Sequence, residues 1–511
     1  MGTVLQRKLA IFVITVGALL RLRQLLAIRS LWCDETMLAM NLYAKSFQEL
    51  MFSPLDFDQL APVGYLVLGK LSVILFGPNE LGFRMPAFIF GVCSLPLAYL
   101  LGRSAFKSAW SALCFTSLIA LSPILVYYSN EVKPYELDAF FALLNLYAYQ
   151  CYCADKLRPW ALWAIGAASL LFSFPACFVL AAIGALEFLR NIRQGKRQPA
   201  IHAAVISSCW LITFAAIYAV FIRGSHNSDY MQDYWQSGFM PHAPGQAIPW
   251  LGESLLGLSH LSLFQDRPNG LKSSLDWFNW SNLTALTLIA IGLACGFRSK
   301  QRPLVAIALA AAIMIGASAV ELYPFRNRML LGLTPLVYLA LTSGLDYCLC
   351  APRKTLRWVG IAYSSALLGL LALSAAWTAI RPTQHQDIKA VMAYIQAHAE
   401  PGDQIAVSRW SYLTYFYYSP VYELSNPPDI KVRSYPEAKQ FMAEQAPSGR
   451  IWFLFSVRPG QGARFIDELT SKDAQQLARQ DAQGASCFLL EFSPSASHAA
   501  NRPPSPAIPN L

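Results

Sequence analysis

The chain has 511 residues, of which 55% are hydrophobic and 14% charged, and its mean hydropathy is +0.37. This composition leaves too little polar surface to coat a soluble globule of that size, so it excludes a soluble protein and indicates a polytopic membrane protein. The net charge of +10 does not indicate nucleic-acid binding, because the basic residues lie in six clusters in short hydrophilic segments beside apolar runs.

The first apolar run extends from Leu9 to Ile28 and has no small-residue cleavage site, so we expect a retained span rather than a signal peptide. Placing all six basic clusters in the cytoplasm predicts eleven transmembrane helices, with the N-terminus inside and the C-terminus outside. The predicted spans cover residues 9–28, 85–102, 109–127, 136–153, 160–172, 175–189, 201–222, 282–297, 304–320, 329–349 and 358–380.

One apolar segment, Pro62 to Gly77, is excluded from the spans because it is short, begins with proline and contains Lys70. We expect it to form an interfacial helix on the outer surface, within a long first external loop that covers residues 29–84. The other predicted external segments are residues 129–138, residues 224–281, residues 321–328 and the tail after Ile380.

The tail has the composition of a soluble domain, and we expect a small α/β domain over residues 381–492, following a transmembrane domain over residues 1–380. Helix-like patterns cover residues 387–398, 438–444 and 465–479, and strand-like patterns cover residues 404–408, 430–433, 451–456 and 487–492. Residues 493–511 are rich in Pro, Ser and Ala, which predicts disorder.

An acidic pair, Asp34-Glu35, follows the first span directly, and ionisable residues so close to hydrocarbon indicate a function. The predicted topology places further charged residues on the same outer face: Glu131, Lys133, Asp138, Arg326 and Arg328. A carboxylate is a suitable general base toward a hydroxyl, and nearby cations stabilise a departing phosphate. Each residue also has a structural interpretation, as a helix-end acid, a surface salt bridge or an arginine that reaches lipid headgroups.

Four ordered motifs resemble those of the GT-C membrane glycosyltransferases, in the branch of the protein O-mannosyltransferases and the lipid A aminoarabinose transferase. The motifs are LWCDE (31–35), DFDQLAPVGYLVLGKLSVILFGPNELGFRMP (56–86), YYSNEVKPYELDAFFALL (127–144) and YPFRNRMLLGLTP (323–335), and the resemblance covers most of residues 9–380. It implies a helical membrane fold and inverting transfer of a sugar from a polyprenyl-phosphate donor to an acceptor hydroxyl on the extracytoplasmic side of the inner (plasma) membrane.

The resemblance also implies roles for individual residues. Asp34 would be the general base, and Glu35 would orient the acceptor or donor. The second functional acid is either Glu131 or Asp138, and the sequence leaves both open. Arg328, Arg326 and Lys133 would hold the donor phosphate, and Gln59, Tyr135 and Tyr323 would line the substrate site.

The chain departs from the aminoarabinose branch at Asp58-Gln59-Leu60-Ala61-Pro62, where relatives often have a lysine followed by two prolines. This difference argues against lipid A as the acceptor, so a lipid, a saccharide and a protein all stay open. No zinc-type ligand spacing is present, and the branch implies no metal cofactor, although a divalent metal is an open alternative.

Three other functions compete with a single-sugar transferase. A lipid or saccharide transporter or flippase would line its path with the outward charges, but the middles of most predicted spans are uncharged. A non-catalytic receptor or assembly factor would bind a partner through the external domain. The sequence does not distinguish an oligosaccharide ligase of the same fold from a single-sugar transferase.

Overall fold

A computed structural model describes residues 2–222, 229–264, 275–299, 301–424, 430–432, 449–456, 466–467, 470 and 474–492. The chain divides into two compact units. The first comprises residues 1–28 and 38–383, and the second comprises residues 29–37 and 384–511.

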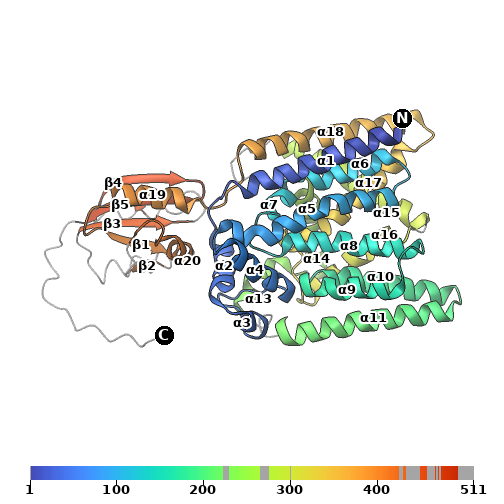
Figure 1. The fold of residues 1–511 in the computed structure, drawn as a ribbon. Helices are drawn as coiled ribbons and strands as arrows, with labels where there is room; N and C mark the ends of the chain where they lie inside the picture. The colour runs from blue at the N-terminus through green and yellow to red at the C-terminus, as the bar shows by residue number, and fades with distance from the viewer. Residues whose placement is uncertain are drawn as a thin grey trace. The chain divides into compact units, whose positions relative to one another are not determined.

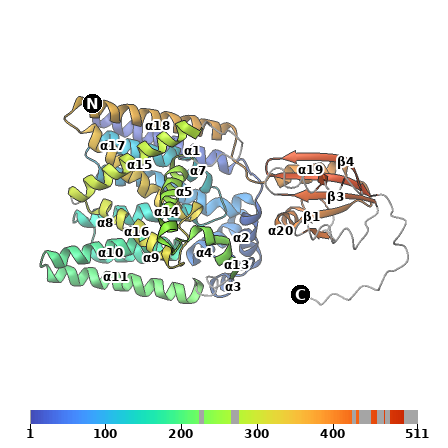
Figure 2. The same ribbon diagram turned by 180° about the vertical axis from the view of Figure 1, so that it is seen from behind.

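The first unit is a bundle of helices, in which the long helices run side by side and the short helices α3, α4 and α13 gather at one end (Figures 1 and 2). Its α-helices are α1 (Gly2–Leu25), α2 (Cys33–Ala44, beginning in the second unit), α3 (Phe47–Phe52), α4 (Val63–Phe76), α5 (Glu80–Ala105), α6 (Ala109–Leu121), α7 (Pro123–Tyr128), α8 (Tyr135–Cys153), α9 (Pro159–Phe172), α10 (Ala176–Arg193), α11 (Arg197–Ile217), α13 (Asp229–Trp235), α14 (Pro244–Phe264), α15 (Leu275–Arg298), α16 (Arg302–Ala319), α17 (Thr334–Leu349) and α18 (Lys354–Ile380). A π-helix, η1 (Tyr218–Ile222), continues α11, and two 3₁₀-helices are η2 (Gln236–Gly238) and η3 (Asn327–Leu333).

Each of the eleven predicted spans coincides with one or two of these helices, and the mostly helical fold with a small C-terminal sheet is as the sequence predicted. Within the described residues, five helical stretches are long and apolar enough to cross a membrane: Glu80–Ala105, Arg197–Ile222, Arg302–Ala319, Asn327–Leu349 and Lys354–Ile380. Several other apolar helices are shorter. The chain is therefore a multi-pass membrane protein, whereas the number of crossings and their orientation stay predictions.

The third predicted span, 109–127, consists of two helices because Ser122-Pro123 interrupts it. Proline has no backbone N–H and clashes with the preceding turn, so α6 ends at Leu121 and α7 begins at Pro123. The buried guanidinium of Arg21 on α1 donates to the carbonyl oxygens of Ile119 and Ala120, at 3.1 and 3.2 Å. Arg21 thereby satisfies backbone acceptors that the interrupted helix leaves open.

Two glycines allow α15 and α17 to pack with their backbones in close contact. A Cβ atom added to Gly292 would lie 2.0 Å from the carbonyl oxygen of Ala340, and one added to Gly344 would lie 2.1 Å from that of Leu288. Small residues at such positions are typical of helix interfaces in membranes, where close van der Waals packing holds the helices together.

The predicted external loops contain regular structure. Residues 62–77 form α4 as predicted, and its Lys70 donates to the carbonyl oxygens of Leu42 and Tyr43 at the end of α2, both at 3.1 Å. This contact explains a lysine in an otherwise apolar helix, since a cation at a helix C-terminus is stabilising. Residues 224–281, expected to be a loop, contain α13, the 21-residue α14 and the start of α15.

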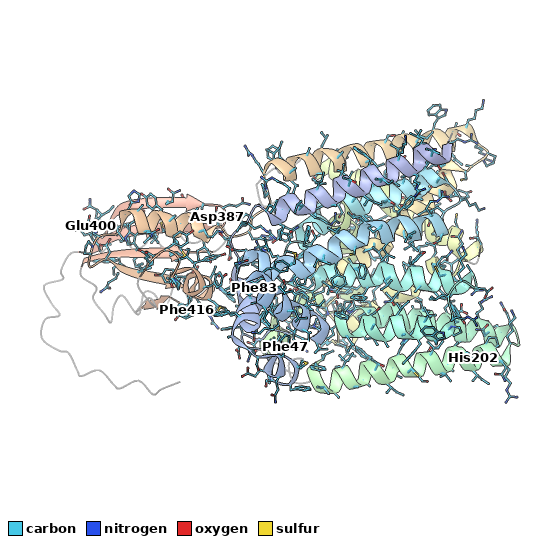
Figure 3. All side chains as sticks on the ribbon, viewed as in Figure 1. Phe47, Phe83, His202, Asp387, Glu400 and Phe416 are labelled. Carbon is cyan, nitrogen blue, oxygen red and sulfur yellow. The ribbon has the colours of Figure 1, made fainter. Side chains whose placement is uncertain are left out.

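The second unit contains a five-stranded sheet in the order β2-β1-β3-β5-β4. Its strands are β1 (Gln404–Ser408), β2 (Ile430–Val432), β3 (Gly449–Phe455), β4 (Ala474–Ala482) and β5 (Ala485–Phe492), with helices α19 (Ile388–His398) and α20 (Arg409–Tyr418). Strands β2, β1 and β3 are parallel, whereas β5 is antiparallel to both β3 and β4. Asp387 and Glu400 flank the two ends of α19 (Figure 3).

Strands β1, β2, β3 and β5 and helix α19 lie where the sequence predicted them, but the helix predicted over residues 465–479 is wrong in its second half. Residues from Ala474 onward form β4, because they pair with β5 in a hairpin whose turn is tightened by Gly484 at φ +67°. Helix α20 was not predicted. The helix predicted over 438–444 and the disorder predicted for 493–511 lie outside the described residues.

Candidate functional site

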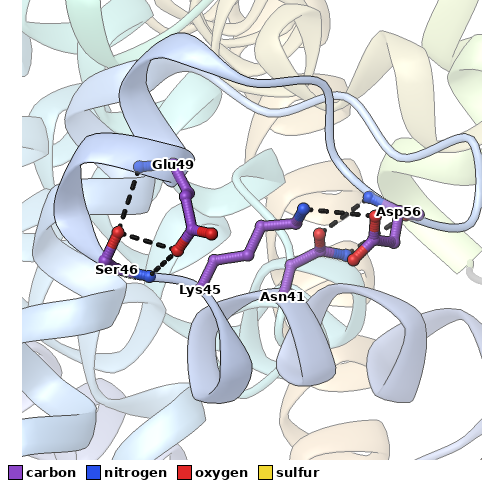
Figure 4. Close-up of polar contacts among 5 residues, drawn as sticks. All are labelled: Asn41, Lys45, Ser46, Glu49 and Asp56. Atoms are coloured by element: carbon purple, nitrogen blue, oxygen red, sulfur yellow. Dashed lines mark hydrogen bonds and ion pairs between the residues drawn. The ribbon is translucent and has the colours of Figure 1, made fainter. Parts of the chain in front are cut away.

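The loop before α4 is held by contacts to α2 (Figure 4). Asn41 and Asp56 exchange two hydrogen bonds: the backbone N–H of Asp56 donates to Asn41 Oδ1 at 2.8 Å, and Asn41 Nδ2 donates to the Asp56 carbonyl at 3.2 Å. Lys45 Nζ lies 3.1 Å from the Asp56 carboxylate. Phe57 and Asp58 then take positive φ angles of 63° and 51°, which turn the chain sharply before Gln59.

Gln59 and Lys133 meet in the interior of the bundle. Lys133 Nζ donates to Gln59 Oε1 at 2.6 Å, and the two side chains come from the first and second predicted external loops. A buried ammonium requires partners, and the Gln59 amide oxygen is one of them. The structure thus joins two of the residues that the sequence placed at the site.

The second predicted external loop places Glu131 among tyrosines. Glu131 is 1% exposed, and the hydroxyl of Tyr127 donates to its Oε1 at 3.4 Å. The neighbouring Tyr128 experiences the charges of both Glu131 and Arg328, which lie nearly 200 residues apart in sequence. Glu131 and Arg328 therefore both lie close enough to Tyr128 to act on its pKa, and sequence reasoning did not identify Tyr128.

Arg328 contacts two aromatic rings. Its guanidinium carbon is 5.8 Å from the centroid of Tyr135 and 5.6 Å from that of Trp235, within the range of cation–π contacts. Contacts of this kind help to orient a guanidinium, which binds phosphate in a planar, bidentate manner. Arg326, by contrast, is exposed and donates to the Ser237 carbonyl at 3.4 Å, so the two arginines are not equivalent.

Asp138 and Tyr323 lie close to one another, and Tyr323 also lies close to Tyr135. Asp138 is 7% exposed on the first turns of α8, and its charge acts on the Tyr323 hydroxyl, which donates to the Met329 carbonyl at 2.8 Å. Burial, together with the nearby Asp138 carboxylate, holds the pKa of Tyr323 well above its usual range. Tyr323 therefore stays neutral and remains a hydrogen-bond donor.

Asp34 and Glu35 lie in the first turn of α2, in the part that belongs to the second unit. Glu35 is fully buried, and its Oε2 accepts from the backbone N–H of Trp32 at 3.4 Å, as a glutamate in a capping box does. Asp34 is partly exposed. The local geometry thus gives Glu35 a capping contact, whereas Asp34 is partly exposed with its Oδ2 atom buried.

Metal ions in proteins are typically held by groups of His, Cys, Asp and Glu side chains. Within the stretches that the structure describes, no group of three or more His, Cys, Asp or Glu side chains has the geometry to hold a metal ion.

Comparison with known proteins gives one partial sequence relative. No protein-family model matches the chain. An uncharacterized protein of Aquifex aeolicus is 34% identical over 138 residues, which are 26% of this chain and 27% of the relative. The chain thus matches about a quarter of that relative's length.

Comparison with solved structures gives matches over almost the whole chain. An oligosaccharyltransferase of Archaeoglobus fulgidus, in complex with Zn and sulfate, aligns over 94% of this chain and 73% of its own chain, with 12% sequence identity and a TM-score of 0.51. The oligosaccharyltransferase AglB of Archaeoglobus fulgidus, with an inhibitory peptide and a dolichol-phosphate, matches 96% of this chain and 74% of its own, at 11% identity and a TM-score of 0.48. ArnT of Cupriavidus metallidurans, bound to undecaprenyl phosphate, aligns over 98% of this chain and 99% of its own chain, at 12% sequence identity and a TM-score of 0.46. The chain has the fold of the GT-C membrane glycosyltransferases.

Proposed function

We propose that this chain is a membrane glycosyltransferase that moves a sugar from a polyprenyl-phosphate donor to an acceptor hydroxyl on the extracytoplasmic face. The observation that carries the proposal is that Arg328 lies within cation–π distance of Tyr135 and Trp235, while Arg328 and the buried Glu131 both act on Tyr128. A fixed guanidinium suits a phosphate leaving group, and the GT-C fold supports an enzyme that transfers glycosyl groups.

In the proposed reaction, Asp34 takes the proton of the acceptor hydroxyl, and the acceptor oxygen attacks the anomeric carbon. The bond from that carbon to the phosphate oxygen breaks on the opposite face, so the configuration inverts. Arg328, with Lys133 as a second cation, stabilises the negative charge of the departing lipid phosphate. The sugar-phosphate linkage already contains a good leaving group, and the protein mainly supplies orientation, a base and charge stabilisation.

The remaining residues have supporting roles in this proposal. Glu35 caps the helix that carries Asp34, and Gln59 orients Lys133. Glu131 is the second functional acid rather than Asp138, because Glu131 and Arg328 share Tyr128, whereas Asp138 acts on Tyr323. Tyr135 and Tyr323 line the site, and Arg326 contributes least. The chain needs no metal in this proposal, and its partners are the lipid donor, an acceptor and membrane lipids.

The test uses purified full-length protein in nanodiscs and a panel of radiolabelled polyprenyl-phosphate sugars. We expect release of the lipid phosphate from one donor by the wild-type protein and a loss of at least about 100-fold in the Asp34→Asn variant, since general-base catalysis contributes roughly 10²- to 10⁴-fold. Asp58→Asn, a change in an exposed carboxylate, is the matched control. No Asp34-dependent release from any donor would refute the proposal and leave a transporter or flippase.

An oligosaccharide ligase is the second candidate, because the fold match with a TM-score above 0.5 is to an oligosaccharyltransferase. The same panel separates the two functions when it includes lipid-linked oligosaccharides. Turnover of those donors alone would favour the ligase, and turnover of single-sugar donors would favour the proposed transferase.

A further inference from the structure

The segment that carries Asp34 is bonded to the C-terminal sheet unit on both sides of that residue. The backbone N–H of Leu31 donates to the Tyr418 hydroxyl at 2.9 Å, and that of Cys33 donates to Gln386 Oε1 at 3.0 Å. On the following turn, the hydroxyls of Thr36 and Thr414 lie 3.1 Å apart. These partners are more than 350 residues distant in sequence and belong to the same compact unit.

Contacts just before Leu31 extend the same attachment. Ser30 Oγ donates to the Asp387 carboxylate at 3.1 Å and accepts from Gln384 Nε2 at 3.2 Å. The ring of Trp32 lies 5.2 Å from that of His385. Residues 30 to 36 are therefore fixed at nearly every position around Asp34.

The residues that hold this segment are themselves held rigidly. Gln386 Nε2 donates to the carbonyl of Ser456, whose N–H donates to Ser411 Oγ at 2.6 Å, directly after strand β3. Thr414 and Tyr418 lie on the buried face of α20, at 1% and 3% exposure. The anchor is thus a side-chain network at the carboxyl ends of parallel strands, where ligand and active sites of such sheets are usually built.

Rigid support of this kind has a catalytic consequence. A base contributes fully only when it is held within a fraction of an ångström of its productive position, and that precision comes from the residues packed around it. Leu31 and Cys33 each direct a backbone N–H, rather than a replaceable side chain, at the sheet unit. The attachment therefore fixes the backbone from which Asp34 projects.

We propose that Tyr418, Thr414 and Gln386 are positioning residues for the transfer reaction, through which the C-terminal unit sets the place of Asp34. The proposal rests on the function of Asp34 proposed above. It assigns to the sheet domain a direct part in turnover, rather than only the recognition of a partner.

The test compares Tyr418→Phe and Thr414→Val with Thr414→Ser, which keeps the hydroxyl, and with Tyr394→Phe, a tyrosine on α19 that packs on Trp452 instead. We expect kcat to fall about 3- to 10-fold in the first two variants, as loss of a neutral hydrogen bond implies, with the KM for the donor unchanged. Thr414→Ser and Tyr394→Phe should turn over like wild type.

A second readout does not depend on activity. Cys33 lies in the held segment and is 7% exposed, so its labelling by N-ethylmaleimide, quantified at the peptide level by mass spectrometry, reports release of the segment. Cys487 in β5 is fully buried, and burial raises its pKa to about 12, so its labelling is the internal reference for intact folding. We expect faster labelling of Cys33, at unchanged Cys487 labelling, in Tyr418→Phe and Thr414→Val.

The outcomes separate the two proposals. Wild-type kcat in Tyr418→Phe and Thr414→Val overturns the positioning role, and so does a fall in kcat without faster Cys33 labelling. Full turnover by Asp34→Asn would instead overturn the proposed base. The positioning role is supported if kcat falls and Cys33 is labelled faster in Tyr418→Phe and Thr414→Val, while Thr414→Ser has the wild-type kcat and labelling rate.

Discussion

Lys133 Nζ donates a hydrogen bond of 2.6 Å to Gln59 Oε1, and this contact links two segments that are 74 residues apart. Both side chains are more than nine-tenths buried, so the contact replaces part of the hydration that the ammonium loses. It also gives the charge of Lys133 one fixed direction.

Removing the partner of Lys133 should weaken donor binding. In Gln59→Leu, the ammonium loses its acceptor, and we expect the KM for the lipid donor to rise about 10-fold, because hydrogen bonds to charged groups are worth roughly 1.5–3 kcal/mol. Lys133→Met should have the larger effect. Steady-state kinetics measure both, and a KM within twofold of wild type in Lys133→Met would exclude a role in phosphate binding.

The two arginines of the YPFRNR motif should differ in importance. Arg328→Lys retains the charge but loses the planar group that contacts Tyr135 and Trp235, and we expect turnover to fall at least about 10-fold. Arg326→Lys alters an exposed side chain and should cost less than about threefold. Equal losses in the two variants would contradict the assignment of the phosphate to Arg328.

Arg21 should be important for stability rather than chemistry. Its guanidinium donates to three backbone carbonyls and faces the buried Glu136 across Gly91, where an added Cβ would lie 3.2 Å from both side chains. Arg21→Met leaves that carboxylate without its neighbouring cation, and we expect a loss of about 3–5 kcal/mol.

Thermal unfolding in detergent measures the effect of Arg21→Met. The double variant Arg21→Met/Glu136→Gln is the control, because it removes both charges and should be less destabilised than the sum of the single variants. Additive losses would show that the two side chains do not interact.

The glycines between α15 and α17 should not tolerate a side chain. In Gly344→Ala, the methyl group would lie 2.1 Å from the Leu288 carbonyl oxygen, and the helices must separate at a cost of about 1–3 kcal/mol. Gly369→Ala on α18 meets no atom within 4 Å and should leave stability equal or slightly raised. Thermal unfolding of the two variants compares them directly, and an unchanged midpoint in Gly344→Ala would rule out this close packing.

The sequence predicts most elements of this fold because the length of an apolar segment and the position of a proline determine local structure without help from distant residues. The predicted limits of β1, 404–408, are those observed, and the helix at 62–77 differs by one residue at each end. Residues 474–479 belong to the segment predicted as a helix, 465–479. Pairing with β5 makes them part of strand β4 instead. The secondary structure of such segments depends on their tertiary contacts.

The candidate site was predictable in its residue types but not in its pairings. The motifs identified Gln59, Lys133, Glu131 and Arg328, yet nothing in the spacing indicates that Gln59 meets Lys133 or that Glu131 and Arg328 both act on Tyr128. Those contacts arise from helix packing between distant segments. The convergence of Asp34 with Arg328 stays a prediction that the proposed experiments test.

The hydrogen bond from the Leu31 N–H to the Tyr418 hydroxyl joins residues that are 387 positions apart. During synthesis, this bond can form only after Tyr418 has been made. A ribosome adds about 5–20 residues per second, so the acidic pair emerges tens of seconds before its binding surface exists. Newly made protein must keep residues 29–37 undocked until residues 384–418 have been made and folded. Under the proposed function, Tyr418, Thr414 and Gln386 could hold the Asp34 segment only after the sheet-containing unit has folded, so turnover would depend on the last unit to be made.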